Sequence, residues 1–378
     1  MPEKKQKVLI VHNYYQIPGG EDTVVANEKK LLEENGHEVI LYTRHNSELK
    51  TISKVQKMLL PFTTVFNLKT YREVRKLIEK HKVDIIHVHN TLNLVSPSVY
   101  YAGFWMKIPV VQTVHNFRLL CPNATFFRDG HLCEESIKKG LLCAVKNKCY
   151  RGSRIQTLAC VVSIVFHRII GTYRKLKYIC LTEFNKEKLL HLKQIKENNI
   201  FVKPNFVQIS GNVVPYEKRK NRFIYVGRLE EIKGTGVLLE AWKLLGKEAP
   251  ELLVCGKGPL EEWAREYVKN NDLRNVKLLG FLPNDRVKDL VGESKALILP
   301  TQVYEGFPVT IVEAYGSGTP VIASDLGNAG NLVIPDVTGQ KFLYQSAKAL
   351  SDVVKNFDSY DVDKILGIYQ EKYSAEKN

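Results

Sequence analysis

The sequence predicts an α/β protein built from two doubly wound, Rossmann-like domains. Short apolar runs typical of buried strands alternate with amphipathic stretches of helical spacing, which is the pattern of a parallel sheet covered by helices. The pattern stops in a polar segment, 204–221, and then starts again. A length of 378 residues also suits two domains. We therefore predict an N-terminal domain over 1–205 and a C-terminal domain over 206–378.

The first half contains six strand-like runs. They lie at 7–13, 38–43, 83–88, 109–114, 178–181 and 200–203. The spacing of apolar residues predicts a helix over 21–35 and a longer helical stretch over 154–176. Residues 48–82 are basic and amphipathic, and the apolar step Leu59–Phe62 interrupts them. An insertion that contains cysteines occupies 117–152.

The second half repeats the alternation. Strands are expected at 222–226, 251–255, 276–279, 296–299 and 320–323, and helices at 234–246, 259–271 and 285–291. Ligands of doubly wound sheets bind beyond the carboxyl ends of the strands. Two such domains facing one another are expected to form a cleft between those ends, so residues that directly follow strands are the candidates for a site.

Positive charge is concentrated in the first half. Residues 1–205 hold 33 Lys/Arg and 17 Asp/Glu, whereas residues 206–378 hold 22 and 23. A surplus of 16 in one half favours a polyanionic partner: an anionic membrane surface, a lipid pyrophosphate or nucleic acid. The alternative is a solvated basic surface that only aids solubility. No stacking-aromatic signature of a nucleic-acid-binding domain is present, so we expect the membrane surface and no nucleic acid.

The N-terminal residues, MPEKKQKVLIVHN, run directly into a strand and lack the charged and apolar regions of a secretory signal. The longest apolar stretch, Leu158 to Phe166, is too short to span a bilayer. We therefore expect a cytoplasmic protein that is peripheral on the inner face of the plasma membrane.

Two carboxylates flank the start of a short helix in TQVYEGFPVTIVEAYGSGTPVIASD, residues 301–325. Glu305 lies in the loop after a strand, Pro308 suits a first helical position, and Glu313 lies within the helix. Free N–H groups at the helix start favour a bound phosphate. Since carboxylates repel an anion, Glu305 and Glu313 are better suited to accept hydrogen bonds from a neutral polyol. A nucleotide sugar carries both groups.

Two cations stand at the turn after the first strand of the second half. Arg228 and Lys233 lie five residues apart in GRLEEIKG, and they are suited to clamp a diphosphate, which the Arg fork can bind through two oxygens. Gly19 and Gly20 follow the first strand of the chain and precede a helix, where glycines let a diphosphate approach the backbone. G-x-G-x-x-G is absent, so a dinucleotide fingerprint is not supported.

In order along the chain, G-R-L…K-G and E-x7-E with G-F-P between its glutamates resemble the signature of family 4 of the retaining glycosyltransferases, which have the GT-B fold. The resemblance implies that Glu305 contacts the donor sugar and Glu313 the ribose. It extends the donor site to the residues between them, namely Gly306, Phe307, Pro308, Val309 and Thr310. Gly256, Lys257 and Gly258, and also Phe281, resemble turns that lie near the nucleotide base.

His115 ends the strand 109–114 in the sequence T-V-H-N. A single histidine is more often structural than catalytic, but the family has a histidine here that contacts the donor sugar and phosphate. The resemblance therefore implies a catalytic role for His115. His12, His87 and His89 also end strands, and we expect them to be acceptor-side or structural residues.

Four cysteines fall within 29 residues: Cys121, Cys133, Cys143 and Cys149. Without a secretory signal, structural disulfides are not expected. Four thiols in one insertion could bind a structural zinc ion, although no C-x2-C pair is present. Thiols without a metal and a facultative disulfide remain the alternatives. No cofactor is expected for catalysis.

The sequence thus predicts a retaining glycosyltransferase that uses a UDP- or GDP-sugar and a saccharide or lipid-linked acceptor in cell-surface polysaccharide synthesis. A nucleotide-sugar epimerase on the same fold is the alternative, and a non-catalytic nucleic-acid-binding protein is an alternative of another class. Members of the family typically end in a helix that returns to the first domain. Here the last residues, 373–378, lie where that helix is expected to begin.

Overall fold

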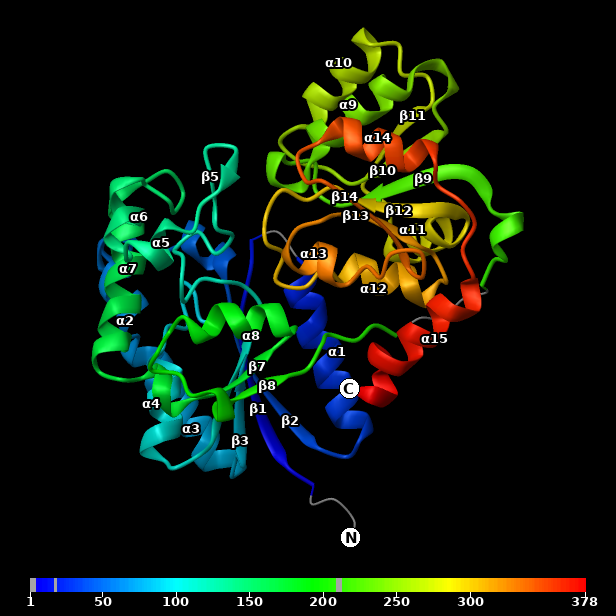
Figure 1. The fold of residues 1–378 in the computed structure, drawn as a ribbon. Helices are drawn as coiled ribbons and strands as arrows, with labels where there is room; N and C mark the ends of the chain where they lie inside the picture. Colours follow the sequence, from blue (N-terminus) through cyan, green and yellow to red (C-terminus); the bar gives the residue numbers. More distant parts are fainter. Residues whose placement is uncertain (1–4, 17–18, 209–212) are drawn as a thin grey trace. The chain divides into compact units, whose positions relative to one another are not determined.

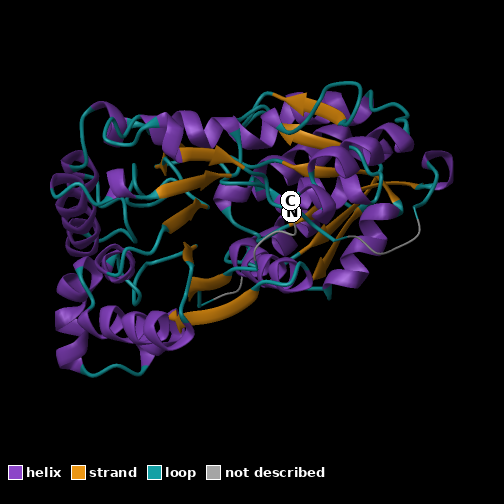
Figure 2. Ribbon diagram, turned by 90° about the horizontal axis from the view of Figure 1, so that it is seen from below, coloured by secondary structure: helices purple, strands orange, loops and turns teal. Residues whose placement is uncertain are grey.

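The computed structural model describes residues 5–16, 19–208 and 213–378. The chain divides into two compact units: Met1–Thr125 with Glu134–Lys203, and Phe126–Cys133 with Pro204–Asn378. In each unit a layer of parallel strands carries helices on both faces (Figure 1, Figure 2). The polar segment expected to link the two halves includes residues 209–212, which lie outside the described residues.

The first unit contains a six-stranded parallel sheet in the order β2-β1-β3-β4-β7-β8. Its strands are β1 (Lys7–Tyr14), β2 (Glu38–His45), β3 (Ile85–Val88), β4 (Val110–Val114), β7 (Lys177–Cys180) and β8 (Ile200–Val202). Its helices are α1 (Gly20–Glu34), α2 (Lys54–Val65), α3 (Leu68–His81), α4 (Ser98–Trp105), α5 (Glu135–Lys138), α6 (Leu142–Lys146), α7 (Arg154–Ile169) and α8 (Glu183–Leu190). Strand order reverses between β1 and β3, which places the switch point of this sheet there.

The second unit also contains a six-stranded parallel sheet, in the order β11-β10-β9-β12-β13-β14. Its strands are β9 (Lys220–Val226), β10 (Glu251–Cys255), β11 (Val276–Gly280), β12 (Ser294–Leu299), β13 (Val321–Ser324) and β14 (Gly339–Phe342). Its helices are α9 (Thr235–Leu245), α10 (Glu261–Asn270), α11 (Asn284–Gly292), α12 (Val309–Gly316), α13 (Gly327–Asn331), α14 (Ala347–Lys355) and α15 (Val362–Lys372). A small hairpin, β5 (Phe127–Arg128) and β6 (His131–Leu132), is grouped with this unit. The switch point lies between β9 and β12.

Both sheets bury apolar strands under helices, as the alternation predicts. In the second unit Phe223, Tyr225 and Trp242 are almost completely buried, and the rings of Phe223 and Trp242 meet edge to face at 6.0 Å. In the first unit Val8 and Ile10 of β1 pack against Val25 of α1. Residues that end the central strands are thereby fixed at one edge of each rigid sheet.

Two local predictions were wrong, and one strand of the two large sheets was missed. The helix expected over 154–176 ends at Ile169, because Gly171 adopts a left-handed φ of 69° and its N–H bonds back to the carbonyl of Arg168. The expected interruption at Leu59–Phe62 does not occur, since α2 runs through Pro61 to Val65. The missed strand is β14, whose residues GQKF lack an alternating apolar pattern.

The C-terminal helix α15 packs on α12 within the second unit. Asp361 caps it by accepting hydrogen bonds from the N–H groups of Asp363 and Lys364. The following Tyr373 accepts a backbone hydrogen bond from Val207 and lies beside the rings of Phe307 and Tyr315. In the described residues, no helix combines the length and apolar character that crossing a membrane requires.

Candidate functional site

The switch point of the second sheet brings a cation and a carboxylate together. Lys233 precedes α9 in the loop after β9, and Glu305 lies in the loop after the neighbouring strand β12. Lys233 Nζ lies 2.7 Å from Glu305 Oε1, and both side chains are largely buried. Thr301 donates its hydroxyl to the same carboxylate oxygen at 2.8 Å. The two loops therefore present one charged pair at the edge where a doubly wound sheet binds its ligand.

The backbone around this pair is closely packed. Gly234 has a left-handed φ of 75°, and a Cβ added there would lie 1.8 Å from the carbonyl oxygen of Pro300. Asn328 donates from Nδ2 to the carbonyl oxygens of Glu305 and Gly306, each at 2.8 Å. The close approach of Gly234 to Pro300 joins the two loops, and Asn328 of α13 holds the backbone of Glu305 and Gly306 in place.

Arg228, the second predicted cation, is on the same loop but is half exposed. Its guanidinium pairs with Glu230, with 2.9 Å between Nη1 and Oε1. The intervening Leu229 is buried and exchanges backbone hydrogen bonds with Lys257 and Leu260. The loop is thus anchored by Leu229, while Arg228 remains able to turn toward an anion.

The helix α12 presents its first turn next to Glu305. The chain enters α12 through Pro308, which occupies the N-cap, so that Val309 and Thr310 begin the helix. Phe307 is buried just ahead of it. One turn further on, burial raises the pKa of Glu313, and Lys288 opposes this shift. Hydroxyl groups that donate hydrogen bonds to this buried carboxylate would stabilise its ionised form.

The residues predicted to lie near the nucleotide base directly follow β10 and β11. Gly256 lies so close to Gly227 that a Cβ would meet its carbonyl oxygen at 1.9 Å, and a Cβ on Gly258 would meet the Leu229 carbonyl at 2.4 Å. Lys257 and Phe281 are exposed there. Glycine at these positions brings the loop after β10 against the loop that carries Arg228.

His115 lies in a pocket of the first unit, at the carboxyl end of β4. Asn116 and Arg118 follow it along this pocket, and His89 and Asn90 line it from the end of β3. The guanidinium of Arg118 bonds to the carbonyl of Pro122 at 2.8 Å. Burial lowers the pKa of His115 well below its ordinary range, so this imidazole is uncharged at neutral pH. The pocket thus combines hydrogen-bonding groups, among them the uncharged His115, with the guanidinium of Arg118.

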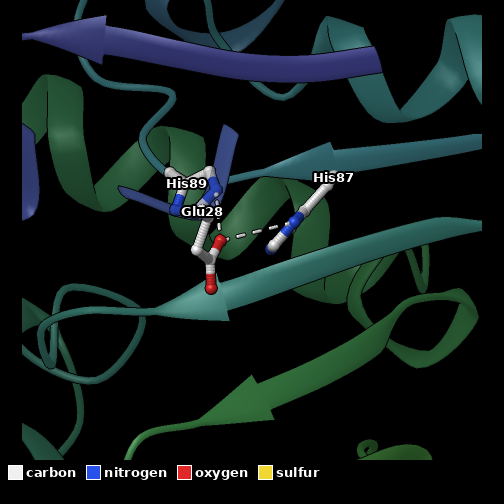
Figure 3. A group of neighbouring side chains, drawn as sticks. All are labelled: Glu28, His87 and His89. Atoms are coloured by element: carbon white, nitrogen blue, oxygen red, sulfur yellow. Dashed lines mark ion pairs between the residues drawn. The ribbon is translucent and has the colours of Figure 1, made fainter. Parts of the chain in front are cut away.

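A buried carboxylate stands behind His115. His115 Nε2 lies 2.9 Å from His89 Nδ1, and His89 Nε2 lies 3.2 Å from Glu28 Oε2 of α1. His87 Nδ1 lies 3.6 Å from the same oxygen, and Figure 3 shows the carboxylate pointing at both imidazoles. Lys203 reaches the other oxygen, Oε1, at 3.1 Å.

These contacts explain how Glu28 is tolerated. Burial acts to raise its pKa, but His87, His89 and the Lys203 ammonium outweigh burial and hold this pKa well below the ordinary range. Burial lowers the pKa of His87 to about 3. Glu28, His87 and His89 also form a group of ligand atoms within 4.8 Å of one another, so they are the described residues that could hold a metal ion.

Gly19 and Gly20 begin α1 beside a second carboxylate cluster. Gly19 is the N-cap and donates its N–H to Asp22 Oδ2 at 3.0 Å, while Asp22 Oδ1 lies 2.7 Å from His12 Nε2. Tyr15 donates to Glu21 Oε2 at 2.7 Å, and burial raises the pKa of Glu21 to about 8. Among the described residues, a Cβ on Gly19 would meet nothing within 4 Å.

Two family models match this chain. The model of the glycosyl transferases group 1 matches residues 209–359, and that of glycosyltransferase family 4 matches residues 18–155. The first stretch contains the β9/β12 switch point, and the second contains α1, β3 and β4 with Glu28, His89 and His115. The chain is therefore similar to the group 1 glycosyltransferases in its second half and to glycosyltransferase family 4 in its first half.

Individual relatives agree with that similarity. The amylovoran biosynthesis glycosyltransferase AmsK of Erwinia amylovora is 30% identical over 152 residues, which are 38% of this chain and 37% of AmsK. The match therefore spans little more than a third of that relative. A crystal structure of a glycosyltransferase from Rickettsia africae is similar with a TM-score of 0.69 and 19% identity, covering 99% of this chain and 95% of that one.

Anabaena HepE in complex with UDP-glucose is similar with a TM-score of 0.62 and 16% identity, covering 98% of this chain and 96% of HepE. These likenesses, together with two parallel α/β sheets, establish the GT-B fold that the sequence predicts.

The four cysteines of the insertion make contacts with their own surroundings. Cys121 is buried and its Sγ lies 3.0 Å from Asn123 Oδ1, while Cys143 Sγ lies 3.0 Å from the carbonyl of Gly140. Cys149 donates its N–H to Ala144, and Cys133 donates to Phe126 beside the β5–β6 hairpin. A structural zinc ion at these four residues stays a prediction.

Sequence reasoning missed Glu28, Thr301 and Arg118. Glu28 had a detectable signal, because it falls on the apolar face of its helix, at helical spacing from Val24 and Val25. A charged residue at such a position requires partners in the core. Arg118 follows His115 by three residues, but nothing local marks it. The role of Thr301 depends entirely on the fold that brings Lys233 and Glu305 to it.

Proposed function

We propose that this glycosyltransferase moves a sugar, with retention of configuration, from a UDP- or GDP-sugar to a saccharide acceptor carried on a lipid. The reaction would serve the synthesis of a bacterial surface polysaccharide from the cytoplasmic side of the membrane. The observation that carries the proposal is the Lys233–Glu305 pair at the β9/β12 switch point. A cation and a hydrogen-bond acceptor, held side by side where a nucleotide is expected, suit the diphosphate and the hydroxyls of one donor molecule.

Charge neutralisation of the leaving group is the main task of the second unit. When the bond between the anomeric carbon and the phosphate oxygen breaks, its electron pair goes to the diphosphate. Arg228 and Lys233 would stabilise that charge, and such stabilisation is commonly the largest protein contribution to catalysis. Two cations can do this without a metal ion, so no cofactor is needed for this step.

Retention would come from attack on the same face. The acceptor hydroxyl oxygen forms the new bond to the anomeric carbon on the side from which the diphosphate leaves, and its proton passes to a phosphate oxygen of the leaving group. Glu305 would accept hydrogen bonds from the donor sugar, and Glu313 from the ribose. His115 is assigned to the sugar and its phosphate.

The pocket of the first unit supports a saccharide acceptor. The imidazole of His89 and the amide of Asn116 suit sugar hydroxyls, and Arg118 suits an anionic group of the acceptor. The relatives support the donor and the pathway: HepE is solved with UDP-glucose, and AmsK is named for amylovoran biosynthesis.

Thermal-shift measurements with UDP-, GDP- and ADP-sugars would test donor binding, and we expect stabilisation by one base. Lys233→Gln should abolish most of that shift, whereas Lys243→Gln on the exposed face of α9 should not. A transfer assay with the stabilising donor should then yield a product with the donor's anomeric configuration. Inversion would refute retention, and conversion of the donor without any acceptor would identify an epimerase instead.

A further inference from the structure

The helix α7 of the first unit carries an apolar stripe on its solvent side. Ile155, Leu158, Val162, Phe166 and Ile169 recur at intervals of three and four residues, and all five are exposed, from 44% for Phe166 to 79% for Ile169. Helices of soluble domains normally turn such a stripe toward the core. In α7 other residues, such as Cys160, Val161 and Ile164, face the core. The exposed stripe is therefore not needed to pack the helix on its own domain.

The helix α2 carries a second outward stripe. Val55, Met58, Leu59 and Phe62 are all exposed, and Met58 and Phe62 each reach 71%. The two helices pack side by side at one side of the unit (Figure 1). Ser163 of α7 donates to the carbonyl of Thr64 of α2 at 3.3 Å. The two stripes together are called the α2–α7 face below.

Only basic charges accompany this face in the sequence. Residues 49–72, which include α2, contain five Lys/Arg and no Asp/Glu, and residues 136–175, which include α7, contain nine Lys/Arg and no Asp/Glu. Among these residues Lys54, Lys57 and Arg154 are exposed on the two helices themselves. Most of the positive surplus of the first half therefore belongs to the segments that carry the outward apolar stripes.

We propose that the α2–α7 face is the surface by which the protein docks on an anionic lipid bilayer. Helices that lie in the membrane interface combine an apolar stripe, which enters the boundary between headgroups and acyl chains, with Lys and Arg around it. The basic residues attract an anionic leaflet within the screening length of the solution.

Charge complementarity favours the bilayer over a second copy of the chain. A symmetric dimer through this face would place the same basic segments of both copies against each other, and like charges repel. Nucleic acid offers negative charge but no apolar phase for nine aliphatic and aromatic side chains, whereas an anionic bilayer offers both.

The docking surface also has a consequence for the acceptor, which rests on the proposed function. The inner sides of the same helices line the His115 pocket through Thr64 of α2 and Ser163 and Ile164 of α7. A bilayer bound to the outer side would therefore lie one helix layer away from this pocket. A lipid-linked acceptor could keep its lipid in the bilayer while its saccharide enters the pocket.

Vesicle sedimentation of the full chain tests the proposal. The probes are vesicles of phosphatidylcholine alone and of phosphatidylcholine with phosphatidylglycerol. We expect binding only to the anionic vesicles, weakened by salt. Phe62→Ser with Ile169→Ser removes two exposed apolar side chains and should weaken binding at least about tenfold. Phe201→Ser, an exposed aromatic residue on the edge strand β8, is the matched control and should bind like the wild type.

Several outcomes would overturn the inference. These are equal binding to neutral vesicles, no binding to either kind, or an unchanged affinity of the double variant. Self-association in the absence of vesicles that the double variant abolishes would assign the face to a second copy. Affinity for UDP, measured in parallel, separates this inference from the proposed function, because donor binding depends on the second unit and should be the same in all these variants.

Discussion

His89 Nδ1 lies 2.9 Å from His115 Nε2, so the imidazole assigned to the donor is oriented by a second imidazole. A carboxylate can only accept, and Glu28 Oε2 lies 3.2 Å from His89 Nε2, which favours the His89 tautomer with its proton on Nε2. Its Nδ1 then accepts from His115 Nε2–H. The remaining nitrogen of His115, Nδ1, is thereby left as an acceptor for a sugar hydroxyl.

Glu28 is accordingly predicted to be a positioning residue. Glu28→Gln keeps the shape of the side chain but can donate to His89, which removes the preference for one tautomer. We expect kcat to fall about tenfold to a hundredfold, because a misoriented group is costly even when it stays in place. Affinity for free UDP should be unchanged. Imidazole NMR should detect the change of the protonated nitrogen in His115.

Lys203→Met provides the control for Glu28. It removes the 3.1 Å ion pair but leaves the carboxylate beside His89, so the tautomer and kcat should be retained. In Glu28→Gln alone, the Lys203 ammonium loses its carboxylate partner. The double variant with Lys203→Met removes both charges and so avoids this effect. A Glu28→Gln protein that melts earlier but keeps both kcat and the His115 tautomer would reduce Glu28 to a structural residue.

Substitutions of the two glutamates assigned to the donor, Glu305 and Glu313, should affect different kinetic constants. Glu305→Gln removes the ion-pair partner of Lys233 and the negative charge assigned to the donor sugar. Because the sugar ring is the part of the donor that changes most as the bond breaks, kcat should fall. Glu313→Gln should mainly raise KM, since the ribose is the same in ground and transition state. Each effect should be about tenfold to a hundredfold, as expected for a hydrogen bond to a charged group.

Free nucleoside diphosphate is the control for this pair of variants. Its affinity should fall for Glu313→Gln, and for Glu305→Gln it should not fall, because Lys233 is then released from its carboxylate partner. Equal weakening by both substitutions, or transfer unaffected by either, would contradict the assignment of the two roles.

Glu21 should make stability depend on pH. Burial raises its pKa from an ordinary 4.5 to about 8, so the folded state retains a proton that the unfolded state releases. The stabilising contribution of Glu21 is complete below about pH 4.5 and is lost as the pH rises through about 8. Burial lowers the pKa values of His87 and His115 instead, and those contributions are lost only as pH falls below 6.5.

Between pH 6.5 and 8 the Glu21 effect therefore acts without these histidines. We expect the melting temperature to decrease across this range, and Glu21→Gln to flatten the decrease. Glu34→Gln, an exposed residue at the end of the same helix, should leave the slope as it is. A slope that persists in Glu21→Gln would place the titrating group elsewhere.

Gly234 is expected to tolerate no side chain. Gly234→Ala would place a Cβ 1.8 Å from the Pro300 carbonyl at a left-handed φ, so the free energy of unfolding should fall by at least about 2 kcal/mol. Displacement of the loop should also weaken UDP binding. Gly236→Ala, two residues further on in α9, meets only Trp263 at 3.9 Å and should be neutral or stabilising by up to about 1 kcal/mol. Urea titrations of both variants would measure the contrast.

Zinc in the cysteine segment can be tested by elemental analysis. If Cys121, Cys133, Cys143 and Cys149 share an ion, about one zinc per chain should be found and lost in Cys133→Ser. Transfer activity should survive a chelator, because Arg228 and Lys233 are assigned to the diphosphate. Zinc that is retained in Cys133→Ser but lost in His87→Ala would instead place the ion at Glu28, His87 and His89. A metal-free protein would exclude both sites.

Local patterns in the sequence suffice to predict the parallel α/β architecture and the positions of most strands. Both follow from periodicity, since an apolar run bounded by turn residues forms a buried strand wherever it stands. The same patterns place Arg228, Lys233 and Glu305 directly after strands. Because parallel strands expose their carboxyl ends at one edge of a sheet, chain order is enough to predict that these residues lie near a ligand.

Which of those residues meet depends on the tertiary fold. Lys233 and Glu305 are far apart in the chain, and they pair because β9 and β12 are neighbours in a sheet whose strand order no local pattern encodes. The same holds for Glu28, His89 and His115, which come from α1, β3 and β4. The outward stripe of α7 is a further case. An amphipathic period predicts a helix, but the same period is found in helices that face a protein core and in helices that face a membrane. Only the packing of the opposite side of α7 reveals that this stripe remains exposed.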